Sequence, residues 1–199
     1  MRAVFHKINP AIKFHMTYKK KLIEVALPLA DINREVARAD LQFMSNPGRE
    51  DREKWVLARW CALTERPENS FQKGERPDFA SSKEAVEITE VLLPGRKRTD
   101  EYREAMEFLQ QGNLPEPSEE SAIKTIIDHA HTWIANAVKD KAAKYNALSK
   151  GWILIVYANY PFSDRTQWDL VRDQMGKVSN FREIHSLSAD GNNLQILKP

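Results

Sequence analysis

The sequence holds a single cysteine, Cys61, among its 199 residues. One thiol excludes an internal disulfide and a zinc site built from several thiolates, and it is typical of a reducing compartment. No apolar stretch reaches the length of a membrane-spanning helix, and residues 1–14 lack the continuous apolar segment of a secretory signal. We therefore predict a cytoplasmic protein that does not insert into a membrane.

Two patterns of phosphate-binding loops, GxGxxG and GxxxxGKS/T, are also absent from the sequence. Their absence argues against the common nucleotide-binding loops. A large excess of one charge is missing too, because 30 basic residues face 28 acidic ones, for a formal net charge of +2. Any contact with nucleic acid would therefore depend on local basic patches.

Apolar residues make up 42% of the chain and predict one hydrophobic core in a single domain, 1–199. The periodicities predict a mixed α/β or α+β fold, in which helices cover a sheet whose central strand is the apolar run 151–160. The domain divides into an N-terminal strand and helix at 1–46, a core at 47–188 with a helical insertion at 99–148, and a closing hairpin strand at 189–199. The predicted elements are strand 11–18, helices 31–44 and 47–66, extended segments between 70 and 93, helices 99–112 and 118–148, strand 151–160, helix 163–175, and strands 181–188 and 193–198.

The segment RPDFASSKEAVEITEV, residues 76–91, is the part of the sequence where spacing predicts chemistry. A hairpin with Ser82 and Lys83 at its tip places Asp78 directly opposite Glu87, where two like charges repel each other. Glu87 also interrupts a strand whose two faces are otherwise mostly apolar. An ionised carboxylate in such surroundings needs a cation, a raised pKa or a strand end that reaches water. A hard divalent ion bound by both acids would remove the repulsion and supply a Lewis acid.

At these residues the sequence resembles the PD-(D/E)xK nuclease superfamily. The resemblance rests on Pro77-Asp78, a gap of eight residues, Glu87-Ile88-Thr89 and the later apolar strand, and it covers roughly residues 47–188. It implies a restriction-endonuclease-like fold and metal-dependent hydrolysis of phosphodiester bonds in DNA or RNA. It also implies that Asp78, Glu87 and the carbonyl group of Ile88 hold Mg²⁺ or Mn²⁺.

The resemblance includes one departure and one additional acid. Thr89 stands where the superfamily has a lysine, and a threonine neither carries charge nor acts as a base near neutral pH. Lys73, Lys83 and Lys97 are candidates to replace that lysine from neighbouring elements. Glu53, which lies in line with the apolar stripe of helix 47–66, is implied as an additional ligand. The candidate catalytic residues are thus Asp78, Glu87, Thr89 and Glu53.

Clusters of basic residues are the candidates for contact with the phosphate backbone. Arg96, Lys97 and Arg98 form the best cluster, because they directly precede a predicted helix N-terminus. A second cluster is formed by Lys19, Lys20 and Lys21.

A structural interpretation stays open beside the catalytic one. Asp78 and Glu87 can form a cross-strand pair that Arg76 or another basic neighbour neutralises, without any metal ion. The chain would then be a catalytically inactive nuclease-like fold that binds nucleic acid or a protein partner. The missing motif lysine favours this alternative. Elsewhere, His185 alternates with Phe181, Glu183 and Leu187 in a predicted strand, and the sequence identifies no partner for it.

Overall fold

The computed structural model describes residues 48–92, 120–145, 149–160 and 162–198. The chain divides into two compact units, and nearly all described residues belong to the unit made of Glu53–Gly95 and Ser118–Pro199. The predicted strand 11–18, the helices 31–44 and 99–112 and the basic clusters at 19–21 and 96–98 lie outside the described residues. The division into domains therefore stays a prediction.

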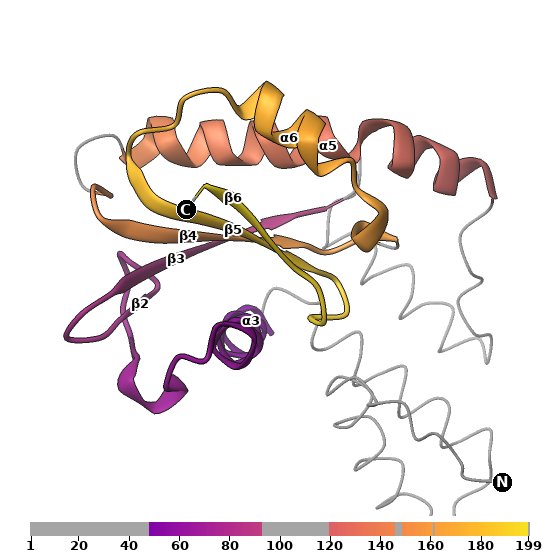
Figure 1. Ribbon diagram of the computed structural model, residues 1–199. Coiled ribbons are helices and arrows are strands. Elements are labelled where there is room, and N and C mark those ends of the chain that lie inside the picture. The colour runs from indigo at the N-terminus through magenta and orange to yellow at the C-terminus, as the bar shows by residue number, and fades with distance from the viewer. Residues whose placement is uncertain (1–47, 93–119, 146–148, 161, 199) are drawn as a thin grey trace, which may run out of the picture. The chain divides into compact units, whose positions relative to one another are not determined.

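Six strands form one mixed sheet in which the spatial order follows the chain, from β1 to β6 (Figure 1). The inner strands β3, β4 and β5 run parallel, and the remaining neighbours pair antiparallel. This sheet confirms the predicted mixed α/β class. The strands are β1 Gln72–Lys73, β2 Phe79–Ala80, β3 Ala85–Val91, β4 Trp152–Ala158, β5 Phe181–Ser188 and β6 Leu194–Lys198.

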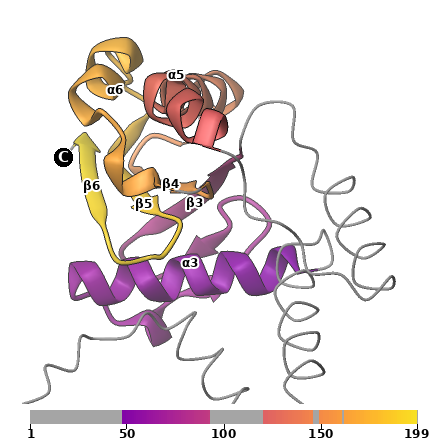
Figure 2. The same ribbon diagram turned by 90° about the vertical axis from the view of Figure 1, so that its right-hand side faces the viewer.

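Helices cover both faces of this sheet. Helices α5 (Glu120–Tyr145) and α6 (Trp168–Met175) lie on one face, and α3 (Arg49–Thr64) lies on the other, as Figure 1 and the turned view in Figure 2 show. Each of α5 and α6 connects two neighbouring parallel strands, and both connections step across the sheet in the same direction. Connections of the same hand therefore leave both helices on one face. Among the described residues, no helix combines the length and the apolar character needed to cross a bilayer.

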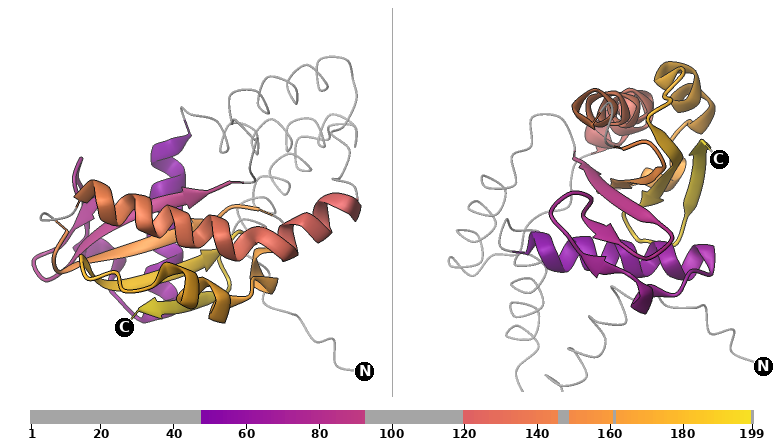
Figure 3. Two further views of the ribbon diagram at one scale, coloured as in Figure 1. Left: turned by 90° about the horizontal axis from the view of Figure 1, so that it is seen from above. Right: turned by 90° about the vertical axis from the view of Figure 1, so that its left-hand side faces the viewer.

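Strand β4 lies between two apolar clusters and confirms the prediction of a central strand buried on both faces. Leu154 and Val156 pack in the cluster under α5 and α6, whereas Ile153 and Ile155 pack in the cluster against α3. All four side chains are fully buried. Figure 3 shows the sheet between its two helical layers from above and from the side. The parallel pairing with β4 thus places β3 beside the most buried strand of the sheet.

The hairpin between β2 and β3 has the predicted register. Phe79 faces Val86 and Ala80 faces Ala85, so the numbers of paired residues sum to 165 in both pairs. The tip spans residues 81–84, where the Ser81 amide donates a hydrogen bond of 2.8 Å to the Glu84 carbonyl. Continued by one residue, this register places position 78 opposite position 87.

The observed helix ends differ from the predicted ones by a few residues. Helix α3 ends at Thr64 rather than at 66, because Glu65 adopts a left-handed conformation with φ of 56°. The helix predicted from Ser163 begins instead with a 3₁₀ turn, Ser163–Arg165, and α6 follows from Trp168. Gly176 ends α6 as predicted, and its amide donates to the Arg172 carbonyl.

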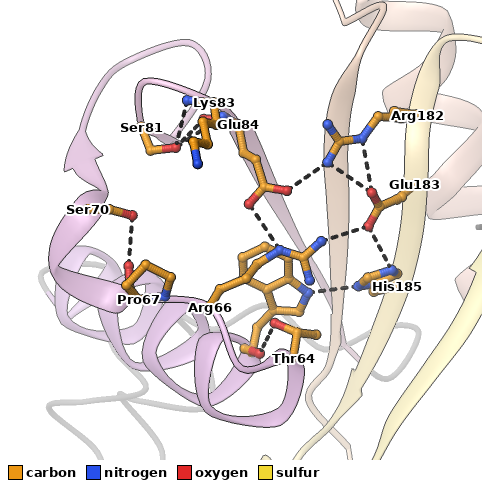
Figure 4. A network of polar contacts seen from close by, with 11 residues as sticks. Thr64, Arg66, Pro67, Ser70, Ser81, Lys83, Glu84, Arg182, Glu183 and His185 are labelled. Atoms are coloured by element: carbon orange, nitrogen blue, oxygen red, sulfur yellow. Dashed lines mark hydrogen bonds and ion pairs between the residues drawn. The ribbon is translucent and has the colours of Figure 1, made fainter.

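A network of charged side chains ties the end of α3 to the β2–β3 hairpin and to β5 (Figure 4). Arg66 forms ion pairs of 3.0 Å with Glu84 and 3.1 Å with Glu183, and Arg182 contacts the same two acids. The Arg66 guanidinium also lies 4.5 Å from the centre of the Trp60 ring. The network thus joins the segment after α3, the tip of the hairpin and β5.

The same network gives His185 the partner that the sequence did not identify. The Trp60 Nε1–H group donates a buried hydrogen bond of 2.7 Å to Nδ1 of His185. Nδ1 must therefore lack a proton, so the ring is neutral, and Nε2 faces a Glu183 oxygen at 3.4 Å. Burial is the largest influence on this histidine and lowers its pKa below 6.5.

We expect Trp60→Phe to lower the free energy of unfolding by about 1–3 kcal/mol, because Nδ1 of His185 loses its only described donor. Urea denaturation at pH 7 measures this loss. Trp133→Phe is the control for the smaller ring, since Trp133 is a half-buried tryptophan of α5 that packs edge-on against Tyr160.

The pH dependence of unfolding separates the hydrogen bond from a simple packing loss. A histidine with a lowered pKa stabilises the fold above its unfolded-state value of 6.5, and this contribution is lost as the pH falls from 6.5 through the lower folded-state pKa. In Trp60→Phe, Nδ1 is open to protonation, so the variant should lose less stability than the wild type between pH 7 and pH 5.5. An unchanged pH dependence would contradict this role of Trp60.

Candidate active site

Asp78 occupies the end of a tight loop that leads into β2. The Gly74 amide donates a hydrogen bond of 2.9 Å to the Asp78 carbonyl and closes the loop. A Cβ atom on Gly74 would lie 2.6 Å from the Pro77 oxygen, so the loop requires glycine there. The carboxylate is buried, and its Oδ2 accepts a hydrogen bond of 2.8 Å from the Ile88 amide on β3. One oxygen of Asp78 is therefore tied to the strand that carries Glu87.

Glu87 points from β3 toward α5 and is only 2% exposed. Its Oε1 accepts two hydrogen bonds from α5, at 2.6 Å from the Lys141 ammonium and at 3.0 Å from the Tyr145 hydroxyl. Its Oε2 is buried and has no hydrogen-bond partner within the part of the chain that the structure describes. The Lys141 ammonium also lies 3.4 Å from the Ile88 carbonyl. A cation thus lies against both Glu87 and Ile88.

A second lysine lies on the Asp78 side of the site. Lys73 of β1 approaches Glu53 of α3 with 2.5 Å between Nζ and Oε2, and its Nζ is 3.7 Å from Oδ1 of Asp78. The same ammonium lies 4.6 Å from the centre of the Phe79 ring. Lys73 therefore links Glu53 to Asp78, and α3, β1 and β3 all contribute to one polar cluster.

The electrostatic balance of this cluster is unfavourable to a charged Asp78. Burial is the largest influence and raises the pKa of its carboxyl group above 3.8, and the charges of Glu87 and Glu53 raise it further. The hydrogen bond from the Ile88 amide and the charge of Lys73 act in the opposite direction without reversing the shift. Among the ion pairs that the described residues show, Lys73 and Lys141 are the cations beside Asp78 and Glu87. Because the pKa of Asp78 stays raised beside them, the site favours an additional cation or a proton.

Most of the predicted site residues lie together. Asp78, Glu87, Ile88 and Glu53 belong to this cluster, and Thr89 is half-buried two residues beyond Glu87 on the same face of β3. Of the candidate replacement lysines, Lys73 reaches the cluster, Lys83 lies at the tip of the hairpin, and Lys97 lies outside the described residues. Arg96 and Arg98 lie outside them as well. The described ion pairs of the two acids are made with Lys73 and Lys141, and not with Arg76.

Lys141 and Tyr145 are not among the site residues predicted from the sequence. Both continue the buried stripe of α5 that contains Ile134 and Val138, at steps of four, three and four residues. A lysine in line with such a stripe is a signal, because lysine is almost never buried without a partner. That signal points to an acid on the facing strand, although it does not identify Glu87 as that acid.

The described residues contain no group of three or more His, Cys, Asp or Glu side chains with the geometry of a metal site. The available ligands are the carboxylates of Asp78 and Glu87 and the main-chain carbonyl of Ile88. Asp78 accepts a hydrogen bond from the Ile88 amide, and the Ile88 carbonyl faces the Lys141 ammonium, so these groups lie around one residue of β3. All of these are oxygen ligands, which suit hard divalent ions such as Mg²⁺. Metal binding here stays a prediction.

Comparison with known proteins identifies a family. The family described as “Putative endonuclease, protein of unknown function (DUF1780)” matches residues 29–184. The match covers more than half of the 199 residues, so the chain belongs to this family. Neither the curated proteins nor the solved structures gave a match.

We expect Asp78→Asn to be at least as stable as the wild type at pH 7. A carboxyl group whose pKa is raised in the folded state lowers stability as the pH rises above its unfolded-state value of 3.8. Asparagine removes the charge, and its side-chain oxygen can still accept the hydrogen bond from the Ile88 amide. The advantage should shrink toward about pH 3, where the acid is protonated in both states.

Thermal unfolding between pH 3 and pH 8 measures this difference. Asp140→Asn is the matched control, because Asp140 is an exposed acid on α5 and its replacement changes the net charge equally. A marked loss of stability at pH 7 in Asp78→Asn alone would show that the ionised acid is a structural element.

Proposed function

We propose that this member of the DUF1780 family is a metal-dependent endonuclease that hydrolyses phosphodiester bonds in DNA or RNA at a centre of the PD-(D/E)xK kind. The proposal depends on one observation, the buried pair of Asp78 and Glu87 with the Lys141 ammonium 2.6 Å from Glu87. The family description supports the nuclease class. The chemistry of the cluster supports the location of the centre.

Asp78, Glu87 and the Ile88 carbonyl are the residues that would hold Mg²⁺ or Mn²⁺. Glu87 offers Oε2, which is buried and has no described hydrogen-bond partner, and Asp78 offers the oxygen that does not bind the Ile88 amide. Such an unsatisfied buried oxygen is costly unless a ligand completes it. A bound ion supplies a Lewis acid and lowers the pKa of a coordinated water.

Lys141 supplies the positive charge that Thr89 cannot. Its ammonium reaches Glu87 from α5, on the same face of β3 that carries Thr89, so the charge comes from a helix instead of from the strand. An ammonium group fixed in a buried site stabilises the negative charge that develops on a phosphate during cleavage. The Tyr145 hydroxyl shares Oε1 with Lys141 and holds the carboxylate in one orientation.

Lys73 and Glu53 act on the Asp78 side of the centre. The Lys73 ammonium lies between the two acids and closer to Glu53, at 2.5 Å against 3.7 Å. Glu53 therefore positions Lys73 beside Asp78, and this role fits the described contacts better than that of an additional metal ligand. The positive charge of the Lys73 ammonium in turn partly neutralises the Asp78 carboxylate.

The test is a cleavage assay with Mg²⁺ or Mn²⁺ on single- and double-stranded DNA and RNA. Glu87→Gln and Lys141→Met should each lower the rate by about a hundredfold or more, because each removes a fixed charge from the centre. Lys139→Met is the matched control, since Lys139 is exposed on the same helix, and its rate should stay within roughly twofold of the wild type.

A double variant separates catalysis from stability. Lys141→Met alone leaves a buried carboxylate without its cation, which costs about 3–5 kcal/mol when one partner of a buried pair is removed. Glu87→Gln/Lys141→Met removes both charges and should recover most of that stability without recovering activity. Cleavage that survives in the double variant would disprove this centre. Nucleic-acid binding by a wild type that never cleaves would favour the inactive alternative.

A further inference from the structure

Basic side chains surround the buried acids in two layers. Lys73 and Lys141 form the inner layer, because each lies within ion-pair distance of Asp78 or Glu87. Arg76 and Lys144 form the outer layer, and both are exposed. Within the part of the chain that the structure describes, the outer pair forms no ion pair with an acid. Its two charges are therefore available to a negatively charged ligand.

Lys144 stands on the α5 side of the site. It lies in the last turn of α5, and its ammonium is 5.3 Å from the centre of the Tyr145 ring. The hydroxyl group of that ring donates to Glu87 at 3.0 Å. Tyr145 therefore contacts both the Lys144 ammonium and the buried carboxylate. Lys141 lies at the same distance of 5.3 Å from the ring, on the inner side.

Arg76 stands on the loop side of the site. It belongs to the short loop that the hydrogen bond from Gly74 to Asp78 closes, two residues before Asp78. Arg76 and Lys144 therefore come from different elements. Arg76 lies two residues from the buried Asp78, and Lys144 lies against the Tyr145 ring whose hydroxyl binds Glu87.

We propose that Arg76 and Lys144 bind the phosphate backbone of a nucleic acid and hold it over the buried acids. This inference builds on the proposed function and names the residues that bind the substrate. A phosphodiester backbone carries a charge at every step, so two uncommitted cations at one site match two of its phosphates. Contacts of this kind position the chain without reading bases, and binding should be independent of sequence.

The experiment measures binding in the absence of cleavage. The full chain carrying Asp78→Asn, in buffer with EDTA, is titrated against labelled single- and double-stranded DNA and RNA over a series of KCl concentrations. Into this parent we place Arg76→Gln and Lys144→Gln, singly and together. Lys139→Gln is the matched control, because Lys139 is exposed on the same helix as Lys144.

The double variant should weaken binding by about tenfold or more, equally for different sequences. On duplex DNA its salt dependence should become shallower by about 0.9 for each phosphate that the protein no longer neutralises. The Lys139 variant should match the parent. The comparison of the four nucleic acids shows which backbone is preferred. Equal affinity and salt dependence in the double variant and the control would overturn the inference, as would a parent that binds none of the four.

The result is separable from the proposed function. Binding that depends on Arg76 and Lys144, in a wild type that does not cleave with Mg²⁺ or Mn²⁺, would support this inference and reject the endonuclease. Cleavage by the wild type, together with unchanged binding in the double variant, would support the endonuclease and reject the role of these two residues.

Discussion

The ion pair between Lys141 and Glu87 is the constraint that connects the fold to the site. A carboxylate on a buried strand loses its hydration, and a cation at 2.6 Å with a second hydrogen bond from Tyr145 compensates part of that loss. Lys141 and Tyr145, the two partners of Glu87, belong to the stripe of α5 that also packs Ile134 and Val138 into the core. The helix must therefore lie along β3 at one register, which satisfies the apolar core and the buried acid together.

Asp78 shows what the cluster costs the protein. The β2–β3 hairpin, the glycine at position 74 and the Ile88 amide together hold its carboxylate beside Glu87, although burial and two neighbouring acids disfavour its charge. Replacement of buried charged groups by well-packed hydrophobic residues of similar volume is often neutral or stabilising. A set of acids retained against stability is typical of sites where function needs them.

The sequence predicted those parts of the structure that depend on local patterns. The structure confirms three such features: the hairpin register in which paired residue numbers sum to 165, the alternating faces of β3, and the burial of β4 on both faces. All three follow from residues close together in the chain. The cations could not be assigned in the same way. Lys141 lies 54 residues from Glu87, and only the packing of α5 on β3 brings them together. The same holds for His185, whose donor Trp60 lies 125 residues away.

Binding of Mn²⁺ to the full chain, measured by isothermal titration and by electron paramagnetic resonance without nucleic acid, tests whether the buried acids form a metal site. If Asp78, Glu87 and the Ile88 carbonyl form a metal site, the wild type binds one ion, and Glu87→Gln and Asp78→Asn lose it while Asp140→Asn retains it. Binding that both site variants retain, or a wild type that binds no ion at millimolar Mn²⁺, would contradict a metal site at these residues.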